Sequence, residues 1–168
     1  RMTTMMKKLL LPLVLLALLA GLWFTLNSPD KAPQATFSAI DGQKMSLNSL
    51  QGRVVLVNFW ATCCSGCVKE MPQIIKAYGD YHSQGFDVIA VAMPYDPPEN
   101  VMAYAKKNGL PFTVALDVDG VLVKAFGDIQ VTPSTVLIDK HGNIVWRVIG
   151  EIDFKALHEV LPQLLKAS

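Results

Sequence analysis

Continuous apolar runs alternate along the chain with segments in which apolar residues recur every three or four positions. The runs at 54–60 and 86–93 are rich in β-branched residues, which is typical of strands buried on both faces. A weaker run at 112–116 predicts a third strand. Helical spacing follows the first run, and residues 96–99, with two prolines, open a second helix that we expect to end near Lys107.

Two segments predict hairpins. Residues 37–40 and 45–50 flank an Asp-Gly pair, which accommodates the positive φ of a tight turn. Residues 135–138 and 144–148 flank a polar turn in the same way. We expect the first hairpin to cover one edge of the sheet.

Helices complete the pattern at the end of the chain. Residues 121–126 predict a short helix, and Asp153 caps a terminal helix whose last turn is interrupted by Pro162. The order strand, helix, strand, helix, strand, followed by a hairpin and a helix, predicts an α/β fold. We expect a central mixed β-sheet with helices on both faces plus an N-terminal β-hairpin.

The N-terminus carries a separate apolar segment. Residues 9–26 contain no charged side chain, and 18 residues are just enough to cross a bilayer. A cleaved signal peptide would have a shorter apolar core, so we favour an uncleaved anchor. The domains predicted are therefore a membrane anchor or signal segment at 1–26, a tether at 27–34 and a globular domain at 35–168.

Charge places the domain outside the cytoplasm. Arg1, Lys7 and Lys8 precede the apolar segment, and such a bias keeps that end cytoplasmic. The remaining 12 Lys and Arg residues are outnumbered by 14 Asp and Glu residues, so the exported part has a net charge of about −2. That balance excludes a typical nucleic-acid-binding protein.

The chemistry concentrates at Cys64-Ser65-Gly66-Cys67, where the first buried strand becomes a helix. The positive end of a helix dipole stabilises a thiolate, which makes Cys64 the candidate nucleophile. Cys67 lies one turn further in and is placed to resolve a mixed disulfide. A structural zinc site would need a second ligand pair, and a structural disulfide across three residues would constrain the unfolded chain little.

A wider set of motifs surrounds the pair: Trp60-Ala61-Thr62-x-Cys64-x-x-Cys67, Glu70, Met71-Pro72 and Val131-Thr132-Pro133. Over residues 33–168 the chain resembles the thioredoxin-like TlpA/ResA family of membrane-anchored thiol-disulfide oxidoreductases. The resemblance implies a thioredoxin-like fold. It also implies a cis peptide at Pro133 facing the Cys64 sulfur, with the backbone of Thr132 pairing with an extended substrate segment.

Glu70 and Trp60 are further candidates for the site. The resemblance implies that Glu70, three residues after Cys67, exchanges a proton with the resolving thiol, although it could instead be a surface residue stabilised by the helix dipole. Thioredoxin has a buried aspartate where this chain has Asn58, and an amide transfers no proton at neutral pH. Trp60 is expected to shield the disulfide and offer a recognition surface, with a core role as the alternative.

Cys63 departs from the family pattern and is expected to be a spare buried thiol. Cys63 and Cys67 also form a C-x-x-x-C pair that suits copper, which favours a Sco-like copper-delivery protein as a rival. That interpretation lacks a well-placed histidine, since His141 lies in a turn and we expect His82 and His158 on solvent-facing helix surfaces. A peroxidase is a third possibility, but it would need a proline-threonine-cysteine pocket with an arginine, and we find no such pattern in the sequence.

The sequence therefore predicts a thiol-disulfide oxidoreductase in the inner membrane, with its domain in the periplasm or extracytoplasmic space. We expect a monomer that acts on disulfide-bearing proteins, with no cofactor, metal site or nucleic-acid partner. The resemblance implies reduction, with electrons from a transmembrane thiol donor and targets in cytochrome c or copper-site assembly. A disulfide oxidase is the alternative, because residue order does not determine the reduction potential.

Overall fold

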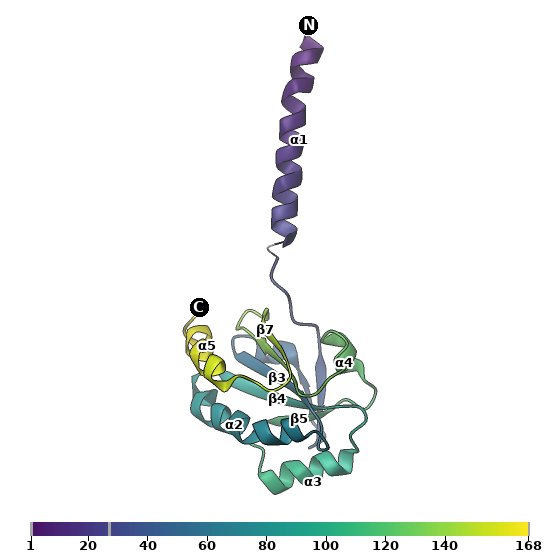
Figure 1. Cartoon of the computed structure of the whole chain (residues 1–168), viewed down its shortest axis with the longest axis vertical. Coiled ribbons are helices and arrows are strands. Elements are labelled where there is room, and N and C mark those ends of the chain that lie inside the picture. Colours follow the sequence, from purple (N-terminus) through teal and green to yellow (C-terminus); the bar gives the residue numbers. More distant parts are fainter. Residues whose placement is uncertain (1, 27, 168) are drawn as a thin grey trace. The chain divides into compact units, whose positions relative to one another are not determined.

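A computed structural model describes residues 2–26 and 28–167, without the side chains of residues 2–11, 24 and 26 (Figure 1). The chain divides after Asp30 into an N-terminal segment and a folded domain. Helix α1 occupies Met2–Leu26 of the first unit.

The predicted anchor at 9–26 lies within α1, but positions 9–11, 24 and 26 have side chains outside the described residues. Across the helices that are described, none combines the length and the apolar character required to cross a membrane.

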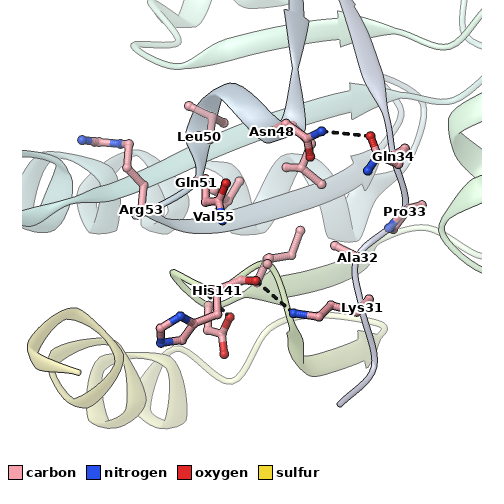
Figure 2. A pocket seen from close by; sticks show the side chains of 14 residues that line it. Lys31, Ala32, Pro33, Gln34, Asn48, Leu50, Gln51, Arg53, Val55 and His141 are labelled. Atoms are coloured by element: carbon pink, nitrogen blue, oxygen red, sulfur yellow. Dashed lines mark hydrogen bonds between the residues drawn. The ribbon is translucent and has the colours of Figure 1, made fainter. Parts of the chain in front are cut away.

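The folded domain begins at Lys31, where the chain docks onto a turn far away in the sequence. The Ala32 N–H donates to the Gly142 carbonyl at 2.9 Å, and Lys31 Nζ donates to the His141 carbonyl at 3.2 Å. Figure 2 shows the bond from Lys31 to His141 beside a pocket, which has a volume of about 430 Å³. It also shows a bond from Asn48 Nδ2 to Gln34 Oε1. The tether predicted at 27–34 is therefore attached to the domain over its second half.

A seven-stranded mixed sheet forms the centre of the domain, in the order β2-β1-β5-β4-β3-β6-β7. Strand β3 pairs in parallel with β4, which pairs in parallel with β5, and the other pairings are antiparallel. The strands are β1 (Thr36–Ala39), β2 (Lys44–Ser46), β3 (Val54–Trp60), β4 (Phe86–Ala92), β5 (Thr113–Leu116), β6 (Ser134–Ile138) and β7 (Ile144–Ile149).

Helices cover both faces of this sheet. One face packs against α2, α3 and α5, and the other against α4 and the 3₁₀ turn that contains Leu47 (Figure 1). Successive residues of β3 alternate between the two cores, as its pleat requires. The helices are α2 (Ser65–Tyr81), α3 (Pro98–Asn108), α4 (Val121–Ala125) and α5 (Phe154–Lys166), with 3₁₀ turns at Leu47–Leu50 and His82–Gln84.

Two local expectations need correction. The strand predicted at 45–50 ends at Ser46, because the Ser46 hydroxyl accepts the Asn48 N–H at 3.3 Å and caps a 3₁₀ turn that buries Leu47. The last turn of α5 does form beyond Pro162, since Leu165 packs into the core there and helps to hold the helix.

Candidate active site

The cysteine pair lies where β3 leads into α2. Cys64 is the N-cap of α2 and is disulfide-bonded to Cys67, with Cα atoms 5.3 Å apart. The Cys67 N–H donates to Cys64 Sγ at 3.2 Å, in the way that an N-cap side chain receives a backbone donor of the first turn. Cys64 is partly exposed, whereas Cys67 is fully buried. Only one of the two sulfurs is therefore accessible to a partner.

An open groove of about 590 Å³ runs past Cys64. It brings together four segments that are far apart in the sequence. Its lining residues are Cys63, Cys64, Ser65, Gly66, Tyr95, Thr132, Pro133, Gly150 and Glu151. The groove shares no lining residue with the pocket in Figure 2.

The Thr132–Pro133 peptide bond is cis, as the resemblance implied. The Pro133 ring lies close to the first turn of α2. A Cβ atom built at Gly66 would be 3.5 Å from Pro133 Cδ. The Pro133 carbonyl accepts the Gly150 N–H at 2.8 Å, which ties this segment to the end of β7. Thr132 is partly exposed and lines the groove, so its backbone is positioned beside the cysteines.

Glu70 is buried in α2, with a side chain that accepts two hydrogen bonds. Asn58 Nδ2 donates to Oε1 and the Ile152 N–H donates to Oε2, both at 3.0 Å. Burial raises the pKa of Glu70 above its ordinary value, the two hydrogen bonds oppose that rise, and the charge of Glu151 adds to it. Glu70 is therefore a buried acid one helical turn after Cys67, and not a solvated surface residue.

Asn58 supports this acid from the neighbouring strand. Its Nδ2 group also donates to Thr135 Oγ1 at 3.0 Å, while its Oδ1 atom is buried and has no hydrogen-bond partner among the described residues. The sequence indicated Asn58, but not the contribution of Thr135 and Ile152, which depends on β6 and on the loop before α5.

Trp60 is placed differently from the expectation. Its side chain has no exposed surface, and its ring packs against Tyr104 with centroids 5.1 Å apart. The indole belongs to the core between the sheet and α3, so it presents no recognition surface. Trp60 therefore has the alternative position, within the core.

Cys63 was expected to be buried, and this is wrong: it is exposed and free, and it lines the groove beside Cys64. The position precedes the first turn of α2, where no packed helix face covers it. His82 stacks on Tyr78 at an exposed position, but His158 is half-buried and lies 3.2 Å from the Tyr81 hydroxyl.

Within the described part of the chain, no three His, Cys, Asp or Glu side chains gather in a way that could hold a metal ion. Cys67, one of the two thiols of the copper-delivery interpretation, is bonded to Cys64. Cys67 could serve as a copper ligand only after that disulfide is reduced.

Sequence reasoning missed an ion pair at the rim of the groove. Lys69 Nζ lies 2.9 Å from Glu151 Oε2. The Glu151 side chain also lies close to Gly66, where an added Cβ atom would be 3.5 Å from Glu151 Oε1. It also missed the contact between Thr62 and Asp96, because Asp96 was interpreted as part of a helix start. No local pattern links residues 34 positions apart.

The chain is similar to a known protein family and to several known proteins. Residues 27–161 match the Redoxin family. The chain belongs to the Redoxin family. Its relatives include a thiol-disulfide oxidoreductase ResA from Bacillus thuringiensis, 34% identical and covering 80% of this chain and 76% of the relative. The ResA of Bacillus subtilis is 29% identical over 88% of both chains.

Solved structures of similar proteins share the fold of this domain. A protein from Neisseria meningitidis described as a thioredoxin is 45% identical, with a TM-score of 0.77 over 83% of this chain and 93% of that one. A thiol:disulfide interchange protein DsbE from Chlorobium tepidum is 27% identical, with a TM-score of 0.74 over 83% and 98%. The thioredoxin-like fold is therefore confirmed. This Redoxin-family protein is a thiol-disulfide oxidoreductase of the ResA and DsbE type, with a Cys64–Cys67 pair.

The raised pKa of Glu70 makes a prediction about stability. The folded protein binds the Glu70 proton more tightly than the unfolded chain, whose value is near the ordinary 4.5. The contribution of Glu70 to the free energy of unfolding is therefore fully present below the pKa of the unfolded chain. It is lost as the pH rises through the pKa of the folded protein. The free energy of unfolding of the wild type minus that of Glu70→Gln should fall over this interval and then level off.

Urea denaturation of the oxidised proteins between about pH 4 and about pH 8 measures this difference. The exposed Glu159 of α5 offers a matched control, because Glu159→Gln should give a difference without this fall. Curves for wild type and Glu70→Gln that run parallel across the whole range would contradict a raised pKa.

Proposed function

We propose that the protein reduces disulfides in exported proteins, with Cys64 as nucleophile and Cys67 as resolving thiol. The observation that carries the proposal is the difference in access between the two sulfurs. Cys64 is partly exposed in the groove at the N-terminus of α2, and Cys67 is fully buried behind it. An accessible thiolate with a buried partner suits attack on one molecule followed by intramolecular resolution.

The exchange has two balanced steps. The Cys64 thiolate attacks one sulfur of the substrate disulfide, forming a mixed disulfide and releasing the other substrate sulfur as a thiolate. The Cys67 thiolate then attacks Cys64 Sγ, re-forming the Cys64–Cys67 disulfide and releasing the second substrate sulfur. The substrate gains two electrons and the protein loses two, which leaves it oxidised, as it is in this structure.

Glu70 assists the second step in this proposal. Cys67 must lose its proton before it attacks, and with no exposed surface it has little access to bulk water. A buried carboxylate with a raised pKa is a suitable proton acceptor at neutral pH, and Glu70 is such a group in the same helix.

Thr132 and Pro133 orient the substrate in the proposed mechanism. Pro133 has no N–H, and its carbonyl is already bonded to Gly150. The backbone of Thr132, at the groove, is then the part of this segment that can pair with an extended substrate chain, as in strand addition.

Reduction requires a supply of electrons, which we assign to a transmembrane thiol donor that reduces the Cys64–Cys67 disulfide by the same exchange. The names of the ResA and DsbE relatives support exchange chemistry. We further propose that the protein acts as a monomer and that its targets are proteins of cytochrome c or copper-site assembly, whose cysteines must be reduced before a cofactor is attached.

We also propose that residues 9–26 anchor the protein in the inner membrane, with the domain on the periplasmic or extracytoplasmic side. Support comes from the uncharged run of 18 residues and from the basic residues that precede it. Apolar side chains of α1 such as Leu16 and Trp23 are each 68% exposed, and a lipid environment would cover them.

Trapping tests the order of the two thiols. In a Cys63→Ser background, reduced Cys67→Ser should accumulate a mixed disulfide with a peptide carrying one internal disulfide, because the resolving thiol is missing. Mass spectrometry should locate the bond at Cys64. The matched variant Cys64→Ser should accumulate little, since the remaining Cys67 thiol is buried. Conjugation of Cys67 alone would reverse our assignment.

The reduction potential tests the direction. Equilibration with glutathione buffers should give a value nearer to that of thioredoxin, about −270 mV, than to that of the oxidase DsbA, about −120 mV. The ratio of oxidised to reduced protein is measured after thiol alkylation. A value at the DsbA end would replace the reductase with the oxidase.

Membrane extraction tests the location. The full chain, expressed in a bacterium, should stay in the membrane pellet after alkaline carbonate washing, and its domain should be digested by protease added to spheroplasts. A chain that starts at Lys31 and is exported by an unrelated cleaved signal should appear in the soluble fraction. Release of the full chain by carbonate would contradict the anchor.

A further inference from the structure

The loop between β4 and α3 contacts both walls of the groove. Asp96 Oδ2 accepts the Thr62 N–H at 2.6 Å, and Asp96 Oδ1 accepts the Thr62 hydroxyl at 2.7 Å. The neighbouring Tyr95 places its hydroxyl 3.3 Å from Thr132 Oγ1. Two consecutive residues thus connect the segment that leads to Cys64 with the segment that ends in the cis-proline.

Asp96 fixes the segment that contains Thr62. It is only 5% exposed, and both carboxylate oxygens accept short bonds from one residue, which fixes position and orientation together. Thr62 lies two residues before Cys64, in a stretch between β3 and α2 that has no regular structure of its own. The bonds to Asp96 therefore restrict the approach of the chain to the nucleophile.

Tyr95 makes a weaker contact with a different consequence. Its side chain is 58% exposed and lines the groove, and its hydroxyl makes one neutral hydrogen bond. Thr132 belongs to the segment that we assign to substrate binding. Loss of this contact would loosen the substrate-binding wall while the cysteines stay in place.

We propose that Tyr95 and Asp96 are positioning residues for thiol-disulfide exchange: Asp96 fixes the Cys64 segment for attack, and Tyr95 fixes the Thr132–Pro133 segment for substrate binding. The proposal rests on exchange at Cys64, as proposed above, but not on its direction. It separates the two residues by kinetic effect, because misplacing a nucleophile slows the reaction of bound substrate, whereas a loosened wall weakens binding.

Single-turnover kinetics with a disulfide-bridged peptide test the separation. For the reduced full chain, Asp96→Ala should lower the maximal rate by about 10-fold or more and leave the half-saturating peptide concentration within about twofold. Tyr95→Phe should raise the half-saturating concentration by about 2- to 10-fold and leave the maximal rate unchanged. Asp96→Asn should recover most of the rate, because its carbonyl can still accept the Thr62 N–H.

Asp117 provides the matched control. It is also 5% exposed and also accepts two bonds, from the N–H groups of Leu122 and Val123, but these belong to the first turn of α4, and Asp117 does not line the groove. Asp117→Ala should lower the melting temperature as Asp96→Ala does, with unchanged kinetics of the folded protein. Equal kinetic losses in the two variants, or an Asp96→Ala protein with the wild-type maximal rate, would overturn the role of Asp96. A Tyr95→Phe protein with wild-type binding would overturn the role of Tyr95.

The oxidised proteins are assayed in parallel with the dithiol form of the peptide. A wild type that reacts only in this direction would contradict the proposed reductase, but the comparison of variants would still decide the positioning roles. The failure of one proposal is therefore distinguishable from the failure of the other.

Discussion

The arrangement of this site depends on the pairing of β3 with a strand on each side. β3 is buried along its whole length and bonds to β4 in parallel and to β6 in antiparallel register, with Phe59 opposite Ser134. The cysteine segment leaves the end of β3, and Pro133 immediately precedes β6. One register therefore brings Cys64 and the cis-proline to the same edge of the sheet, although 69 positions separate them in the sequence. A slip of one residue would turn every β3 side chain to the opposite core.

The same register explains how an ionisable group is accommodated inside the domain. Asn58 lies directly opposite Thr135, and both face the core that contains α2, so a short polar row crosses an otherwise apolar layer. Burying a carboxyl group without partners would be costly, and Glu70 is tolerated because Asn58 and the Ile152 N–H bond to its two oxygens. Asn58 Nδ2 thus joins the acid in α2 to the hydroxyl group on β6.

Much of this fold could be predicted from local patterns, and the failures share one cause. The apolar runs that became β3 and β4, and the cysteines at a helix start, are local signals that the structure retains. Trp60 and Cys63 were misplaced because their exposure depends on which element lies above them: α3 covers the indole, and nothing comparable covers the thiol. The bonds from Thr62 to Asp96 were missed for the same reason, since they join two loops that meet only after β3 and β4 have paired.

The roles that we propose for the two cysteines follow from their places in one helical turn. Cys64 occupies the N-cap, where its sulfur receives the Cys67 N–H and lies at the positive end of the helix dipole, so negative charge is stabilised there. Cys67 supplies that N–H and packs into the core, so its own sulfur has no exposed surface. The proposed mechanism therefore assigns attack to the outer sulfur and gives the inner sulfur a proton acceptor within the protein. In that mechanism the burial of Cys67 limits its access to water, and Glu70, buried in the same helix, accepts its proton.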